Sequence, residues 1–447
     1  MAAFTVIETN HLTRNYKTVR AEDSMDDQLE EALRHQAINR HLAGERRCDI
    51  CRALGRSTAW FDKWWARYRR DGRAGLQSCS RAPRHIHNRT SREIEDAIAR
   101  IRRVLAERTD PELKYAFIGA PTIRTELKRT SLRSIPGLRT VERILQRRGL
   151  SQSRRKRKDP NEPTAYCPVP VPHGPNDVHA WDIVTRHVVG GERVCSFHLL
   201  DRATHYPLLR QYPDKSAVSA PAFLVAVWQT VGLSRLLQMD NEATFCGGYR
   251  FPRVFSQIVR LCLSVGVEVV FIPFYSPKKN ADIESFNSDW DQAFWQRERF
   301  RDLAHVQEER PIFERWYRTR YEPPALQGLT PTEARANFTP RLPGADFTWH
   351  QVGERLPLTA GRVHFIRLVN NHGQIQILNA CWMVDEKLVG EYVWATISTA
   401  EQQLRIYHQE TAKSARQLVA EYEYAIAEEV QELAPAYRTD GEADASV

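Results

Sequence analysis

Apolar residues recur at helical spacing in three segments near the start of the chain: residues 29–42, 46–53 and 57–70. A four-residue break, LGRS, separates the last two segments, and Ser57 at its end is suited to cap the third helix. Trp60 and Trp64, four residues apart, are predicted to face the core. Helices joined by so short a break are typical of a helix-turn-helix, and we expect such a domain over residues 1–85.

The same spacing predicts a second set of three helices: residues 91–108, 120–129 and 138–150. Their apolar stripe consists of Ile123, Leu127, Val141, Ile144 and Leu145. This pattern predicts a second helix-turn-helix domain over residues 86–150. A basic run and a Pro-rich stretch follow, so residues 151–177 are expected to form a linker that can lie along a phosphate backbone. The basic run consists of Arg154, Arg155, Lys156, Arg157 and Lys158.

Alternating apolar and polar positions, typical of strands, begin at residue 178. Three strands joined by tight turns are predicted first, then two helix–strand pairs and a last helix. This order, β-β-β-α-β-α-β-α, predicts a mixed five-stranded sheet with helices on its faces, an α/β domain over residues 178–340. In such a sheet, the ends of neighbouring strands bring together acids that are far apart in the sequence.

Apolar and polar residues alternate again in the last part of the chain, in four segments between residues 358 and 408. Gly-rich and Asn-rich turns separate these segments. This alternation predicts a small SH3-like β-barrel over residues 350–410. Helical spacing after it predicts a helix within residues 411–433. The tail, residues 434–447, is expected to be disordered.

Basic residues are concentrated in the first third of the chain. There are 64 Lys and Arg against 55 Asp and Glu, a formal charge of +9, and counting gives about +17 for residues 1–158 and therefore about −8 for the remainder. A merely solvated basic surface is the alternative, but the basic residues coincide with the predicted helices, which favours nucleic acid as the partner. Groove and phosphate contacts are expected from Thr58, Lys63, Arg67, Arg70, Arg139, Arg143 and the basic run.

The sequence also indicates the cellular compartment of the protein and the redox state of its cysteines. No run of 18 or more apolar residues occurs, and the first residues lack the order of a signal peptide, so we expect a cytoplasmic, nucleoid-associated protein without a membrane partner. Eight scattered cysteines suggest reduced thiols. A zinc site is an alternative that the predicted helix and the spacing disfavour. Its candidate ligands would be Cys48, Cys51, Cys79, His85 and His87.

Three acids stand in motifs of the α/β segment: Asp182 in WDIVT, Asp240 in MDNEATF and Glu284 in PFYSPKKNADIESF. In order and context they resemble the acid triad of DDE transposases with a retroviral-integrase-type, RNase H-like core. The last motif is the most specific, because Pro277, Asn280 and Glu284 stand in the family's places. With the stretches LLDRATHYPLL and YEPPALQGLTPTEARANF, the resemblance covers about residues 178–340.

The resemblance implies metal-dependent chemistry at these acids. Displacement at a phosphodiester needs charge stabilisation of both the attacking and the leaving oxygen, which two hard cations about 4 Å apart provide. Carboxylates are the ligands that Mg²⁺ prefers. By resemblance, Asp182 bridges two Mg²⁺ (or Mn²⁺) ions, with Asp240 on one and Glu284 on the other. The residues before the last helix are expected to contact DNA: Lys278, Lys279 and Asn280.

The implied function is that of an insertion-sequence transposase. Such a protein would bind element ends and target DNA, both double-stranded, as a homo-oligomer, hydrolyse phosphodiesters at the ends and join the new 3′-OH to the target. Two alternatives stay open: a transposase-derived DNA-binding regulator that does not cleave, and an RNase H-like nuclease. The sequence departs from the family at Glu242, where Gly is common, and at Asp291, where relatives often carry Lys or Arg.

Overall fold

The computed structural model describes residues 28–78, 89–151, 165–242, 245, 253–274, 277–344, 347 and 355–438. The chain divides into two compact units, Met1–Arg89 and Thr90–Val447, close to the first boundary expected from the sequence. The basic run at residues 154–158 lies outside the described residues. None of the described helices is long and apolar enough to cross a membrane.

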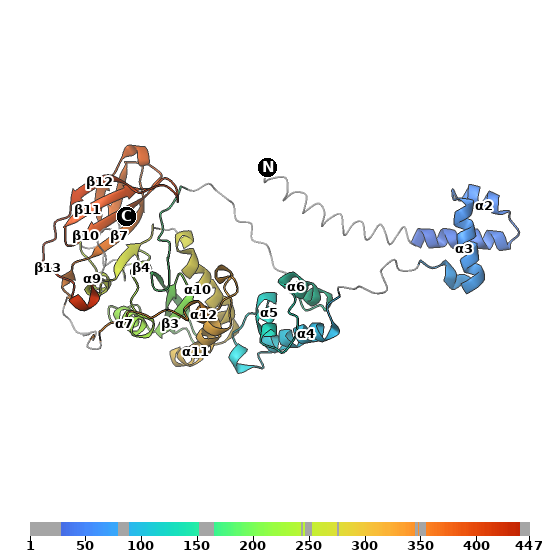
Figure 1. Cartoon of the computed structure of the whole chain (residues 1–447), viewed down its shortest axis with the longest axis horizontal. Coiled ribbons are helices and arrows are strands. Elements are labelled where there is room, and N and C mark those ends of the chain that lie inside the picture. Colours follow the sequence, from blue (N-terminus) through green and yellow to red (C-terminus); the bar gives the residue numbers. More distant parts are fainter. Residues whose placement is uncertain are drawn as a thin grey trace. The chain divides into compact units, whose positions relative to one another are not determined.

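The first unit contains helix 28–42, α2 (Arg47–Ala53), α3 (Thr58–Asp71) and the 3₁₀ helix η1 (Gly72–Leu76) (Figure 1). Ser57 starts α3, because its Oγ accepts a hydrogen bond from the Trp60 amide at 3.1 Å. Phe61 and Trp64 of α3 are buried in one cluster with Ile50 of α2. The predicted helices are confirmed, whereas Trp60 is only partly buried beside this core.

Five strands form the first part of the sheet in the second unit: β1 (Val178–His187), β2 (Arg193–Asp201), β3 (Tyr206–Tyr212), β4 (Leu236–Met239) and β5 (Glu268–Phe271). β1, β2 and β3 pair antiparallel, and β4 and β5 add in parallel on the other side of β1. The order is β5-β4-β1-β2-β3. The predicted mixed sheet is confirmed, but five strands was too few, because further strands join it beyond β5. The parallel strands β1 and β4 point their carboxyl ends in the same direction.

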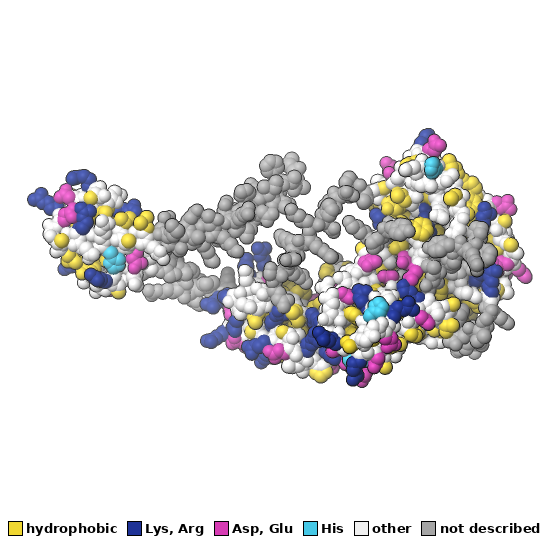
Figure 2. Space-filling model, turned by 180° about the vertical axis from the view of Figure 1, so that it is seen from behind, with side chains coloured by type: hydrophobic (Ala, Val, Ile, Leu, Met, Phe, Trp, Pro, Cys, Tyr) yellow, Lys and Arg dark blue, Asp and Glu magenta, His cyan; other side chains and the backbone are white. Residues whose placement is uncertain are grey.

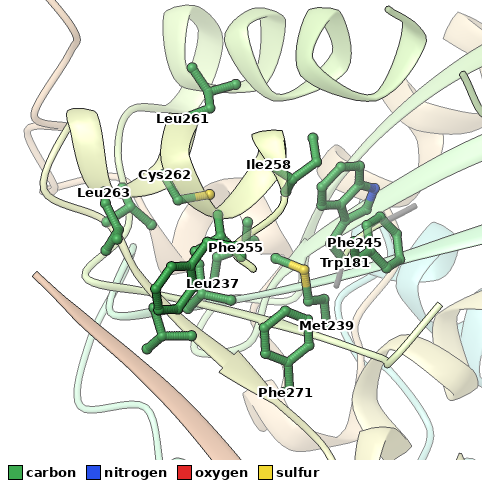
Figure 3. Packing of buried hydrophobic residues seen from close by; sticks show 14 of the residues in the cluster. Trp181, Leu237, Met239, Phe245, Phe255, Ile258, Leu261, Cys262, Leu263 and Phe271 are labelled. Carbon is green, nitrogen blue, oxygen red and sulfur yellow. The ribbon is translucent and has the colours of Figure 1, made fainter. Parts of the chain in front are cut away.

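Helices cover both faces of this sheet: α7 (Ser219–Val231), α9 (Gln257–Ser264), α10 (Ala281–Ala293) and α11 (Leu303–Thr319). Side chains alternate along a strand, so Trp181 and Ala180 of β1 belong to opposite faces. Trp181 packs in the cluster of α7 and α9, close to Phe245 and Ile258 (Figure 3). Ala180 belongs to the cluster that contains the apolar residues of α10 and α11.

The second helical module contains α4 (Arg92–Glu107), η2 (Pro111–Leu113), α5 (Ala120–Lys128) and α6 (Leu138–Arg147). Its predicted apolar stripe is buried, but in one cluster with α10 and α11. Tyr115 Oη donates to Glu309 Oε2 of α11 at 2.8 Å, and Arg320 Nη1 donates to Glu126 Oε2 of α5 at 2.9 Å. The module therefore differs from the separate domain expected over residues 86–150, because apolar periodicity does not show which element covers a stripe.

The C-terminal strands extend the same sheet: β7 (Arg362–Leu368), β10 (Tyr392–Ser398), β11 (Gln403–His408) and β12 (Gln417–Glu423). β7 pairs in parallel with β5, and the order β12-β11-β10-β7-β5 completes a nine-stranded sheet. The SH3-like barrel predicted over residues 350–410 is not confirmed. Alternation correctly indicated strands, but it does not specify which edge a strand joins.

Shorter elements complete the unit. β8 (Gln374–Ile377) pairs with β9 (Ala380–Met383), and β6 (Leu358–Thr359) pairs with β13 (Val430–Gln431). Short helical turns connect other elements: η3 (Pro277–Asn280), η4 (Trp295–Arg297), η5 (Pro324–Leu326), α12 (Pro331–Ala334), η6 (Glu386–Leu388) and η7 (Pro435–Tyr437).

The helix predicted within residues 411–433 is wrong, because β12 and β13 occupy this region. β12 forms an antiparallel ladder with β11, so pairing along the free edge of β11 overrides the helical spacing. The start of the tail is also ordered: Tyr437 in η7 packs against the core cluster. Residues 439–447 lie outside the described part of the chain.

Candidate active site

The fold brings the acids of the three motifs to one region. Asp182 lies in β1, Asp240 directly follows β4, and Glu284 lies in the first turn of α10. Ala180 of β1 pairs with Gln238 of β4, and two residues further along each parallel strand are Asp182 and Asp240. Because side chains alternate between faces, both aspartates belong to the face that α10 covers.

Side chains fix the start of α10 to the sheet. Asn280 is only 4% exposed, and its Oδ1 accepts a hydrogen bond from Gln238 Nε2 of β4 at 2.8 Å. Arg202, in the turn after β2, donates to Asp282 Oδ2 at 2.7 Å and to Gln238 Oε1 at 3.0 Å. These contacts, from β4 and from the turn after β2, hold the helical turn that carries Glu284.

Sequence reasoning missed two side chains beside Asp182: Asn287, which bonds to it, and His198, which bonds to Asn287. Asn287 Nδ2 of α10 donates to Asp182 Oδ2 at 2.6 Å, and His198 Nδ1 lies 2.7 Å from Asn287 Oδ1. Because an amide oxygen only accepts, His198 Nδ1 carries the proton. His198 is fully buried on β2, opposite Asp182 in register. A signal was present for Asn287, which lies three residues after Glu284 and hence on the same side of the helix.

Burial, and to a smaller extent mutual repulsion, raises the pKa values of the three acids. Burial raises the pKa of Asp240 to about 6, and the charges of Asp182 and Glu242 add to this rise while Lys215 opposes it. Burial likewise raises the pKa of Asp182, with further rises from Glu284 and Glu242. For Glu284, lost hydration and then the charge of Asp240 raise the pKa. The site therefore concentrates negative charge that favours a proton or a cation.

An open cleft of ≈ 420 Å³ borders the site, lined by Asp182, Glu284 and Asn287 among others. Arg186 of β1 and Asp291 of α10 also line the cleft and form an ion pair of 2.9 Å. Asp291, where related transposases often carry Lys or Arg, is therefore paired with a basic residue. Glu242, the first departure, pairs with Lys215 at 2.6 Å.

The donor set suits a hard divalent cation. Carboxylate oxygens are preferred ligands of Mg²⁺, and a cation between these acids would offset both the burial and the repulsion that raise their pKa values. Within the described residues, no group of three His, Cys, Asp or Glu side chains has the geometry of a metal site. The match between these acids and a divalent cation therefore rests on the chemistry of the carboxylate oxygens and on their charge.

Most predicted DNA-contact residues that the structure describes are exposed: Thr58, Lys63 and Arg70 on α3, and Arg139 and Arg143 on α6. Arg67 is half-buried, with its guanidinium 4.9 Å from the ring centre of Trp64. Figure 2 shows Lys and Arg side chains on the visible face of each helical module. The side chain of Lys278 lies outside the described part of the chain.

Two predicted contacts before α10 have partners within the protein. Lys279 Nζ lies 5.2 Å from the ring centre of Tyr392 of β10. Asn280 is buried, and its Oδ1 accepts from Gln238, so within the protein it anchors the start of the helix. Its contact with DNA stays a prediction. Motif spacing identified this position, but burial depends on the packing of α10 on β4.

The zinc alternative concerns α2. Cys48 is exposed, whereas Cys51 is buried and its Sγ donates to the Ser57 carbonyl at 3.6 Å. The other candidate ligands, Cys79, His85 and His87, lie outside the described residues. This alternative stays untested.

One family model matches part of the chain. Residues 34–96 match the winged helix-turn helix family, which confirms a helix-turn-helix in the N-terminal region. The chain therefore combines an N-terminal winged helix-turn-helix segment with an α/β unit that has a large mixed sheet. The sequence motifs around Asp182, Asp240 and Glu284 are the features that resemble those of transposases and integrases with an RNase H-like core.

Similar solved structures are integrases of retroviruses. The catalytic core domain of BIV integrase is 14% identical, with a TM-score of 0.27, covering 35% of this chain and 92% of that one. A simian T-cell lymphotropic virus intasome is 11% identical, with a TM-score of 0.33, covering 71% and 100%. The HTLV-2 integrase catalytic core in complex with magnesium is 12% identical, with a TM-score of 0.26, covering 36% and 97%.

The raised pKa of Asp240 makes stability depend on pH. The folded protein binds the Asp240 proton more tightly than the unfolded chain, so stability falls as pH rises from the usual value of 3.8 to about 6. We expect metal-free Asp240→Asn to be more stable than wild type above this window by roughly 2–3 kcal/mol and equally stable below it. Urea unfolding at several pH values measures this difference.

Asp289 provides a matched control, because burial also raises its pKa to about 6 while it bonds to Tyr317 rather than to the three acids. Asp289→Asn is expected to gain stability in the same pH window. Mg²⁺ should stabilise wild type and Asp289→Asn but not Asp240→Asn. An equal response of all three proteins to Mg²⁺ would remove Asp240 from the candidate site.

Proposed function

We propose that the chain is a DDE-type transposase. It binds the terminal repeats of a mobile element and catalyses metal-dependent phosphodiester hydrolysis and DNA strand transfer. The observation that carries this proposal is the convergence of Asp182, Asp240 and Glu284 from two parallel strands and one helix. Their pKa values, raised by burial and by the charges of neighbouring acids, support a shared cation site.

Asp182, Asp240 and Glu284 would hold Mg²⁺ or Mn²⁺, two ions in each site. Bound ions supply charge stabilisation at the attacking and leaving oxygens of the phosphodiester. The protein's own residues orient the acids: Asn287 holds the Asp182 carboxylate, and Asn280 fixes the helix of Glu284. The open cleft beside Asp182 and Glu284 leaves access for a DNA strand.

DNA recognition is assigned to the two helical modules. Exposed Lys63 and Arg70 on α3 and exposed Arg139 and Arg143 on α6 are suited to phosphate and groove contacts. The charge of about +17 over residues 1–158 supports a salt-dependent affinity for DNA. Action as a homo-oligomer and a cytoplasmic location remain predictions from the sequence.

A direct test uses the purified full chain and a DNA fragment that carries the sequences flanking the gene, where the proposal expects inverted repeats. With Mg²⁺ we expect strand cleavage at the repeat ends and transfer of the 3′ end to a second duplex, both lost on addition of EDTA. Specific binding with no cleavage at any Mg²⁺ or Mn²⁺ concentration would instead make the protein a regulator. Cleavage without preference for the repeats would favour the nuclease alternative.

A further inference from the structure

Arg367 lies at the junction between the C-terminal strands and the first five strands. It is in β7, only 4% exposed, and β7 pairs directly with β5. Its Nε donates to the Gln376 carbonyl of β8 at 2.9 Å, and its Nη1 donates to the Ile272 carbonyl after β5 at 3.1 Å. Its Nη2 donates to Asn241 Oδ1 at 2.7 Å. One guanidinium therefore joins β8, the end of β5 and the segment after β4.

Asn241 is the residue that follows Asp240. Its side chain is held on both sides, because its Nδ2 donates to the Ile272 carbonyl at 2.6 Å while its Oδ1 accepts from Arg367. β4 ends at Met239, and the chain leaves the strand at Asp240. The Asp240 carboxylate then accepts from the Glu242 amide at 2.9 Å, which makes a compact turn of residues 240–242.

An arginine has a specific use in this position. Its planar fork donates in several directions at once, whereas the ammonium of lysine is a compact charge on a flexible stem. The Arg367 guanidinium also lies 4.5 Å from the ring centre of Phe274 and 5.1 Å from that of Phe365, which restricts its orientation. The orientation of Asn241 is thereby coupled to the packing of β7.

We propose that Arg367 is a positioning residue for the candidate active site, and that the C-terminal strands complete this site by holding the turn of Asp240 through Asn241. This inference rests on the proposed function for the role of Asp240. Under this proposal the C-terminal strands contribute to catalysis. Their sequence pattern does not indicate such a contribution, and a separate barrel would not make one. Arg367 acts through Asn241 and contacts neither metal nor DNA in this role.

The test compares hydrogen exchange in three variants of the full, metal-free chain. Arg367→Lys removes the fork, and Asn241→Ala removes its acceptor while leaving the carbonyl contacts of Arg367 to Gln376 and Ile272 in place. Arg362→Lys is the matched control, because Arg362 is in the same strand and pairs with Glu268 at 2.6 Å, away from the turn. We expect exchange of the Glu242 amide to rise about tenfold in the first two variants and not in the control.

A second measurement follows cleavage of repeat DNA against Mg²⁺ concentration. Arg367→Lys and Asn241→Ala should each raise the half-saturating Mg²⁺ concentration about 10–100-fold, with unchanged DNA affinity, while Arg362→Lys leaves it at the wild-type value. Unchanged Glu242 exchange in Asn241→Ala, or an equal rise in Arg362→Lys, would overturn the inference. The exchange measurement requires neither metal nor DNA, so it tests the positioning role even if the wild-type protein does not cleave DNA. Failure of the wild type to cleave would refute only the proposed function.

Discussion

Asp182→Asn, Asp240→Asn and Glu284→Gln are each expected to lower Mg²⁺-dependent strand cleavage to less than about a hundredth of the wild-type rate. Each substitution keeps the size of the side chain and removes one charged oxygen ligand. Binding of the terminal repeat should stay almost unchanged, because the exposed basic residues of α3 and α6 lie on other elements. Cleavage of labelled repeat DNA and a gel-shift titration measure the two effects separately.

Asp291→Asn is the matched control for these three variants. It removes an acid that also lines the cleft, but one that forms an ion pair with Arg186. We expect this variant to keep most of the wild-type cleavage rate. A triad variant that retains more than about a tenth of that rate would lose its place as a metal ligand. Loss of repeat binding together with cleavage would instead assign the acid a structural role.

Asn287→Ala is expected to reduce cleavage about 10–100-fold, because Asp182 then loses the donor that orients its carboxylate. The loss should appear mainly as a higher half-saturating Mg²⁺ concentration. His198→Phe should cause a smaller loss in the same direction, since it removes the ring nitrogen that orients the Asn287 amide. Steady-state cleavage at several Mg²⁺ concentrations measures both variants.

The control for Asn287 is Gln292→Ala, on the same helix. Gln292 Nε2 donates to Ser288 Oγ at 2.8 Å, and within the described residues no hydrogen bond joins Gln292 to the three acids. Its replacement should leave the Mg²⁺ dependence unchanged. If Asn287→Ala behaves like this control, the hydrogen bond to Asp182 is not used in catalysis.

Local sequence patterns predicted much of the fold. Ser57 at a helix start and the apolar spacing of α3 predicted that helix within about one residue, because capping and burial are decided within a few turns. Alternation likewise predicted β1, and the motif around Glu284 predicted a helix in the right place. The same local rules failed at β12, where an available strand edge outweighed helical spacing.

The candidate site was also predicted only in part from the sequence. The sequence motifs named three acids, and the side chains that orient them were not named. His198 belongs to the site because β2 pairs in register with β1, and Arg367 belongs to it because β7 joins β5. Both depend on hydrogen-bonded neighbours that are distant in sequence.

The sequence by itself determined the helical modules, the strand–helix order and the identity of the acids, because these depend on the period of side-chain directions and on short motifs. Only the tertiary structure decided that α4, α5 and α6 share a core with α10 and α11, and that the C-terminal strands extend the central sheet. The physical reason is that apolar stripes and strand edges can be satisfied by many partners. Which partner is chosen depends on packing across the whole unit.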